Sequence, residues 1–289
     1  MFSHLGENQI KELINAAKFS VFFIDEDQRV TLKDIGKKST IINWANILGA
    51  KVHNLELTSQ FRCNGSDGYL AWLDNTLQIK QTANETLEAI NYDFQVMDNP
   101  KLIHQEIIQK NNINKKSRMV AGYCWKWVSK NNPDLKDIII NDYTATWNLN
   151  SHSQAWIIHP ESVKEIGCIH TCQGLELDYV GVIIGPDLIV RNDVVMTDAT
   201  KRASTDQSIK GLKAKMRENS SEASTMADVI IKNTYRTLMT RGMKGCYIYC
   251  TDPETQEYFR NRLHKSKQKN ISYENITDGA SLTIDKAKV

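Results

Sequence analysis

The chain has 289 residues, of which 41% are hydrophobic and 24% are charged, with 14 glycines and 5 prolines. This composition excludes collagen-like, low-complexity and disulfide-dense small chains, and the length favours about two domains. The formal net charge of +2 neither demands nor forbids a nucleic-acid partner. The apolar runs are too short to cross a bilayer, and no signal-peptide pattern opens the chain. The sequence therefore predicts a cytoplasmic protein without a membrane partner.

The hydrophobic pattern predicts helices and strands that alternate along the chain. Helices are predicted over residues 7–19, 40–48, 69–77, 101–110 and 254–263, and strands over residues 20–24, 52–57, 92–97, 119–127, 155–158, 165–170, 179–184 and 246–250. Several of these strands are apolar throughout, which is typical of central strands in a parallel sheet. The pattern therefore predicts an α/β fold in which helices cover both faces of the sheet.

Two segments depart from this alternation. Residues 193–228 are rich in serine, threonine, alanine and basic residues, lack aromatic side chains, and include the basic stretch 210–217. We interpret this segment as a surface insertion. Residues 265–289 are rich in lysine and lack apolar periodicity, so they are predicted to form a basic, loosely ordered tail.

The six cysteines lie in apolar, strand-like segments and form no Cys-x-x-Cys pair. This pattern favours buried thiols in a reducing compartment over disulfides or a zinc site. One alternative stays open. If residues 165–170 and their continuation form a strand, Cys168, His170 and Cys172 share one face and offer three zinc ligands.

In an open α/β sheet, ligands lie beyond the carboxyl ends of the strands, so polar clusters after predicted strands are candidate sites. The first cluster is Asp25-Glu26-Asp27-Gln28, which follows an apolar run. An apolar strand that ends in Asp-Glu resembles a Walker B element, where a carboxylate holds Mg²⁺. The alternative interpretation is a solvated acidic turn.

Three further clusters follow in chain order: residues 55–64 with Arg62, residues 169–180 with His170, and residues 233–242 with Arg236 and Arg241. Each has a purely structural alternative. Arg62 would be a surface charge, His170 a hydrogen-bonded histidine at a strand end, and the two later arginines the solvated face of a helix.

Taken together, the four clusters resemble the later motifs of superfamily 1 helicases. The phrases FFIDEDQRVT, LTSQFRCNGSDGYLAWLD, HTCQGLELDYVGVIIGPDL and NTYRTLMTRGMKGCYIYC are similar to those of the Schlafen-type (group 3) DNA/RNA helicase-like ATPases, over nearly the whole chain. The resemblance implies two RecA-like domains with ATP in the cleft between them. It also implies ATP and Mg²⁺ as cofactors, and single-stranded nucleic acid as a partner.

The resemblance further implies roles for individual side chains. Gln28 would sense the γ-phosphate, and Arg62 and Arg241 would contact it from the second domain, with Arg241 as an arginine finger. The other implied nucleotide contacts are Asp25, Glu26, Gly174, Arg236 and Glu176, the last at the ribose. The implied contacts to a strand are His170, Thr171 and Gln173. We favour Gln28 as sensor over Glu26 as catalytic base, because the acidic element resembles the third motif of the family, downstream of a separate Walker B.

The sequence departs from the family at the phosphate-binding loop. A P-loop reads Gly-x-x-x-x-Gly-Lys-Ser/Thr. The nearest segment, Gly36-Lys37-Lys38-Ser39, has Thr31 in place of the first glycine and Lys38 in place of Ser or Thr. We therefore expect residues 1–56 to be the remnant of a first RecA-like domain and residues 57–264 to be a complete second one. We also expect a missing N-terminal P-loop segment to be required for hydrolysis.

Aromatic residues with interleaved lysines gather between residues 123 and 156. Rings of this kind stack on bases in single-strand-binding proteins, and Trp147, in a polar loop, is the best candidate. The alternative is that these rings pack in the core. Three functions stay open: a helicase-like ATPase module that is inactive alone, a non-hydrolysing nucleic-acid-binding module, and, more remotely, a zinc-stabilised interaction domain.

Overall fold

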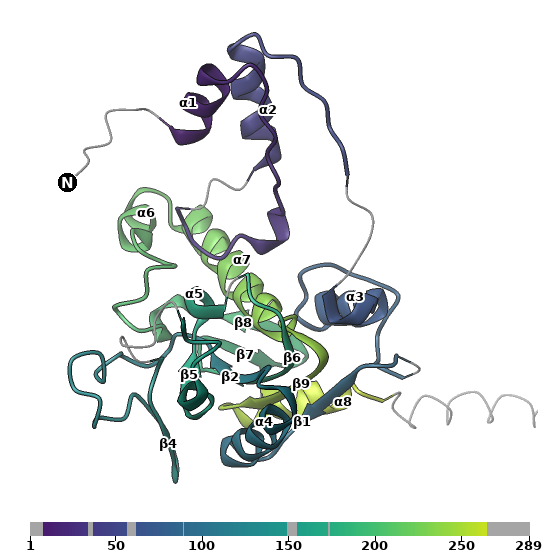
Figure 1. Cartoon of the computed structure of the whole chain (residues 1–289), viewed down its shortest axis with the longest axis vertical. Coiled ribbons are helices and arrows are strands. Elements are labelled where there is room, and N and C mark those ends of the chain that lie inside the picture. The colour runs from purple at the N-terminus through teal and green to yellow at the C-terminus, as the bar shows by residue number, and fades with distance from the viewer. Residues whose placement is uncertain are drawn as a thin grey trace, which may run out of the picture.

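The computed structural model describes residues 8–33, 37–56, 62–88, 90–148, 155–172 and 174–264. Its centre is a parallel five-stranded sheet in the order β1-β9-β6-β2-β5. The strands are β1 (Asp93–Val96), β2 (Ser117–Ala121), β5 (Ile166–Gly167), β6 (Leu177–Ile184) and β9 (Gly242–Cys250). Helices flank this sheet, so the predicted α/β fold with a RecA-like parallel sheet is confirmed (Figure 1).

Alternating side chains of the central strands divide the core into two layers. On one face, Met119 and Ile183 pack with Ile103 and Ile107 of α4 (Pro100–Asn114). On the other face lie α3 (Asp67–Thr76), α7 (Ser220–Met239) and α8 (Pro253–Asn261). Both sheet faces are therefore covered, because strands with two apolar faces must be buried on both sides.

Local signals in the sequence explain where the helices begin. The side chains of Ser66, Asn99 and Asp252 accept hydrogen bonds from the first backbone N–H groups of α3, α4 and α8. Gly181 in β6 allows α4 to lie close to the sheet, since a Cβ at this position would come within 2.6 Å of the Ile103 side chain.

Smaller elements surround this centre. Two antiparallel hairpins are formed by β3 (Ile138–Ile140) with β4 (Tyr143–Ala145) and by β7 (Leu188–Arg191) with β8 (Val194–Thr197). The short helices are α5 (Ile169–Cys172), α6 (Leu212–Glu218), η1 (Glu26–Gln28), η2 (Arg62–Gly65), η4 (Pro160–Lys164) and η5 (Ala199–Lys201). The expected insertion 193–228 thus contains β8, η5, α6 and the beginning of α7.

The N-terminal part contains two helices, α1 (Gln9–Ala16) and α2 (Lys38–Ile47), which pack together at the top of Figure 1. The predicted strands over residues 20–24 and 52–57 are wrong for the residues that the structure describes, which form no ladder there. Several of their apolar side chains are exposed, with Val21 61%, Phe23 85% and Leu55 94% accessible. A strand needs a neighbouring strand for its hydrogen bonds, and the described residues supply none at these segments.

Three other expectations need correction. Residues 155–158 form a turn, although Trp156 is buried. The strand predicted over 119–127 ends at Ala121. The strand predicted over 165–170 ends at Gly167 and gives way to α5, so Cys168, His170 and Cys172 do not share a strand face. The described part of the chain contains no group of three His, Cys, Asp or Glu side chains arranged to hold a metal ion.

The cysteines are reduced, and five of the six are buried, as expected for thiols that serve as small apolar side chains. Burial raises the pKa of the Cys172 thiol to about 12. Within the described residues, no helix is long and apolar enough to cross a membrane. The predicted tail, 265–289, lies outside the described residues.

Candidate functional site

Two of the predicted clusters meet where β6 and β9 begin. Leu177, the first residue of β6, is paired with Gly242, the first residue of β9. Arg241 is only 5% exposed. Its Nε donates to the Thr237 carbonyl at 3.1 Å, and its Nη1 donates to the Leu175 carbonyl at 3.2 Å. We call residues 174–176 together with Arg241 the strand-start site.

The strand-start site lies at the amino-terminal edge of the sheet, whereas the sequence argument placed ligands beyond the carboxyl ends. The reason is that Glu176 and Arg241 precede their strands instead of following them. Gly174 has a φ of +84°, which favours glycine, and both Gly174 and Glu176 are exposed. Glu176 is therefore accessible to a ligand at this edge.

The predicted cluster that contains Arg62 lies beside the strand-start site. In η2, the Cys63 thiol is 3.9 Å from the Thr240 carbonyl. The Tyr69 hydroxyl, at the start of α3, donates to the Met239 carbonyl at 3.1 Å. The backbone that carries Arg62 is thus held next to the end of α7, while the side chain of Arg62 lies outside the described residues.

Arg236 turns toward α3 instead of toward solvent. Its guanidinium pairs with the Asp74 carboxylate, through Nε and, at 3.1 Å, through Nη2. Because Arg236 and Arg241 are 8% and 5% exposed, their interpretation as a solvated helix face is wrong. The assignment of Arg236 to a nucleotide stays a prediction.

The first cluster forms a short helical turn held against α7. The Gln28 side chain donates to the Asp25 carboxylate at 2.5 Å, and the Glu26 carboxylate accepts from the backbone N–H of Lys38 at 2.9 Å. Two bonds fix the following residues, from Asn233 to the Arg29 carbonyl at 3.0 Å and from the Leu32 N–H to the Ser208 carbonyl at 2.8 Å. We call residues 28–32 the Gln28 segment.

Two of the residues predicted to contact a nucleic-acid strand, His170 and Thr171, lie on α5. The His170 side chain is 37% exposed, and its Nε2 lies 3.4 Å from the Ser208 hydroxyl. The Thr171 hydroxyl donates to the Asn148 side-chain oxygen at 2.7 Å. Gln173 lies outside the described residues.

The prediction that Trp147 stacks on a base is wrong for this structure. Its side chain is 1% exposed and its ring stacks on Tyr123, with centroids 5.1 Å apart and planes 15° apart. Its Nε1 donates to the Trp125 carbonyl at 3.1 Å. The polar sequence after Trp147 suggested exposure, but the indole is buried in the core.

Sequence reasoning missed a buried ion cluster made of Asp187, Arg202 and Asp206, whose side chains are all inaccessible. Burial raises the pKa of the Asp206 carboxyl, but the nearby His170 imidazole, whose Nε2 lies 3.9 Å from the carboxylate, and the charge of Arg202 outweigh burial and bring it to about 2. Asp187 accepts a hydrogen bond from Tyr235 of α7. No spacing within the polar segment 193–228 indicates this cluster, because Asp187 lies outside that segment, directly before β7.

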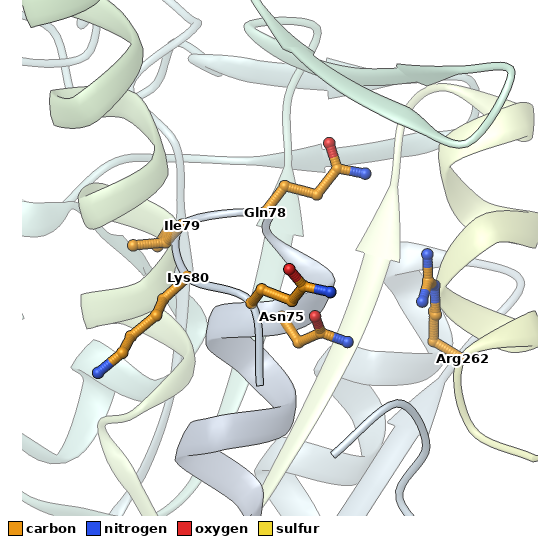
Figure 2. Close-up of a pocket in the computed structure, with 6 residues that line it drawn as sticks. Asn75, Gln78, Ile79, Lys80 and Arg262 are labelled. Carbon is orange, nitrogen blue, oxygen red and sulfur yellow. The ribbon is translucent and has the colours of Figure 1, made fainter. Parts of the chain in front are cut away.

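A pocket lies at the end of α3. Figure 2 shows Asn75, Gln78, Lys80 and Arg262 around it, and none of the predicted site residues lines it. Gln78 is engaged structurally, since its Nε2 donates to the Asp193 carbonyl at 2.6 Å.

Comparisons with known proteins bear on the identity of this arrangement. The family model described as "Schlafen group 3, DNA/RNA helicase domain" matches residues 1–252. "Uncharacterized protein YPL245W" of Saccharomyces cerevisiae is 25% identical over 277 residues, which cover 87% of this chain and 59% of the yeast protein. The chain thus spans less than two thirds of that relative. No solved structure matches. The chain belongs to the Schlafen group 3 DNA/RNA helicase domain family.

Proposed function

We propose that this chain is the portion of an ATP-dependent DNA/RNA helicase-like protein that supplies an arginine finger and contacts a single strand, while the P-loop comes from another segment. In this proposal Arg241 contacts the nucleotide from the strand-start site, Arg62 contacts it from the adjacent η2, and Glu176 meets its ribose. His170 and Thr171 of α5 contact the strand.

The observation that carries the proposal is the meeting of residues 174–176 and Arg241. These groups lie 65 or more positions apart in the sequence, yet the Arg241 guanidinium holds the Leu175 carbonyl and the Arg241 carbonyl accepts from the Leu177 N–H. A guanidinium suits phosphate oxygens, and in this proposal Arg241, which is 5% exposed, exchanges at least one of its bonds to the backbone carbonyls for a phosphate oxygen. Its fixed position beside an exposed carboxylate fits contact with both the phosphate and the sugar of one nucleotide.

The described residues fit only part of an ATP–Mg²⁺ site. Asp25 and Glu26 are carboxylates, which Mg²⁺ prefers, but they already accept hydrogen bonds from Gln28 and Lys38. The sequence holds no P-loop to cradle the β- and γ-phosphates. We therefore derive no phosphoryl-transfer step for this chain alone, and expect it to hydrolyse ATP no faster than background.

The proposal is tested by supplying a P-loop-bearing first domain of this family and measuring strand-stimulated ATP turnover. Arg241→Ala should lower turnover by about 10³-fold, as loss of an arginine finger does. Arg260→Ala is the matched control, because Arg260 lies on α8 and pairs with Asp98. Since Arg241 also holds backbone carbonyls, Arg241→Lys and a thermal unfolding curve separate a folding defect from loss of chemistry. Near-normal turnover in folded Arg241→Ala would refute the role.

The second candidate is a non-hydrolysing nucleic-acid-binding module. It is favoured by the lack of a Gly-x-x-x-x-Gly-Lys-Ser/Thr sequence among the 289 residues. A chain that binds labelled oligonucleotides, but gains no turnover from the added domain, would favour this candidate.

A further inference from the structure

Ser208 lies between two groups that the sequence assigned to different tasks. Its side-chain oxygen is 3.4 Å from His170 Nε2, and its backbone carbonyl accepts the Leu32 N–H at 2.8 Å. His170 belongs to the predicted strand contacts, and Leu32 ends the Gln28 segment. Ser208 itself is fully buried, so it does not contact a nucleic-acid strand directly.

Ser208 is held in place by the buried ion cluster. The Asp206 carboxylate accepts from the Ser208 N–H at 2.9 Å and from its hydroxyl at 2.7 Å. Asp206 in turn pairs with Arg202, which also reaches Asp187 at 3.1 Å. A loop fixed by a fully buried ion pair is a stiff support, because displacing it would separate buried charges.

The Gln28 segment is held by the same loop through the hydrogen bond from the Leu32 N–H to the Ser208 carbonyl. Leu32 is 8% exposed and packs with Leu212, Ala223 and Ala227, so the Leu32 N–H is protected from solvent by packing as well as by its bond to Ser208. Asn233 of α7 fixes the other end of the segment at the Arg29 carbonyl. Movement of Ser208 therefore reaches a segment that begins at Gln28.

We propose that Ser208 is a positioning residue. It couples His170, which faces the bound nucleic-acid strand, to the Gln28 segment, which faces the nucleotide. This proposal rests on the proposed function, because it takes His170 to be a strand contact. A strand that immobilises His170 orders the contact between the imidazole and the Ser208 hydroxyl. The ordered loop then opens less often, and the Leu32–Ser208 hydrogen bond is broken less often.

Hydrogen exchange at Leu32 tests the coupling without ATP turnover. The chain is measured by mass spectrometry, free and saturated with a thymidine or uridine oligonucleotide at low salt. Ser208→Ala removes the contacts of the hydroxyl with His170 and Asp206 but keeps the carbonyl that accepts from Leu32. Ser204→Ala is the matched control, because Ser204 is exposed on the same loop. Fluorescence anisotropy gives each oligonucleotide affinity.

We expect the oligonucleotide to slow exchange at Leu32 by about fivefold in the wild type and in Ser204→Ala, the lower end of coupling between sites. In Ser208→Ala this change should be lost while the affinity stays nearly constant. A purely structural role would change exchange equally in the free and bound states and leave their ratio intact, which would overturn the proposal.

Two other outcomes are distinguishable. If the wild type binds the oligonucleotide but exchange at Leu32 does not change, the coupling is refuted and the proposed function stands. If the wild type binds neither oligonucleotide even at low salt, the proposed function fails and the coupling fails with it.

Discussion

Replacing Trp147 by alanine should destabilise the protein without a direct effect on nucleic-acid binding. The side chain is 1% exposed, stacks on Tyr123 and donates one hydrogen bond to the Trp125 carbonyl. Truncating a buried tryptophan costs about 3–5 kcal/mol, and losing the ring pair adds about 1 kcal/mol. We therefore expect the free energy of unfolding to fall by about 4–6 kcal/mol.

A loss of this size approaches the whole stability of a typical domain, about 5–15 kcal/mol, so a milder variant is needed. Trp147→Phe keeps an aromatic ring but leaves the Trp125 carbonyl without its donor, at a cost of about 1–3 kcal/mol. Urea denaturation measures both variants, and Trp44→Ala on α2, partly exposed, is the control. The reasoning is refuted if Trp147→Ala loses less than about 1 kcal/mol. A folded Trp147→Phe with a tenfold weaker oligonucleotide affinity would also refute it.

The remaining predictions concern charge. Arg202→Met leaves two inaccessible carboxylates without their cation and should cost about 3–5 kcal/mol in urea denaturation, and Arg191→Met, whose side chain is 42% exposed, should cost clearly less. Because the folded pKa of Asp206 is depressed to about 2, its contribution is present above about pH 4 and is lost as pH falls toward 2. Asp206→Asn should lack this loss in thermal unfolding between pH 5 and 2, and an unchanged profile would contradict the pairing. Replacing three exposed lysines by glutamine should lower the salt slope of single-strand binding by about 2, at about 0.7 per phosphate, as read by anisotropy; an unchanged slope would exclude them as phosphate contacts. These lysines are Lys210, Lys213 and Lys215.

The sequence by itself determined the elements whose apolar periodicity and end signals agree. The helices α3, α4 and α8 and the strands β6 and β9 lie close to their predicted ranges. In each case the pattern is local: capping residues mark the helix starts, and continuous apolar runs mark strands that are buried on both faces. The parallel α/β fold follows from these elements and needs no tertiary knowledge.

The tertiary structure decided the segments whose conformation depends on a neighbour. Residues 20–24 have the composition of a strand, but a strand forms only where another strand completes its hydrogen bonds. Residues 168–172 alternate as a strand would, yet β5 ends at Gly167 and the chain turns into α5. The composition of a segment does not determine which other strand lies close enough to form hydrogen bonds with it.

The candidate site divides in the same way. The types of residue at the strand-start site were readable from the sequence, whereas the pairing of Arg236 with Asp74 and the burial of Trp147 were not. The same holds for Ser208, whose significance comes from lying between His170 and Leu32, which are 138 positions apart in the chain. Local sequence specifies which chemical groups a segment carries, but packing of distant segments determines which group each one faces.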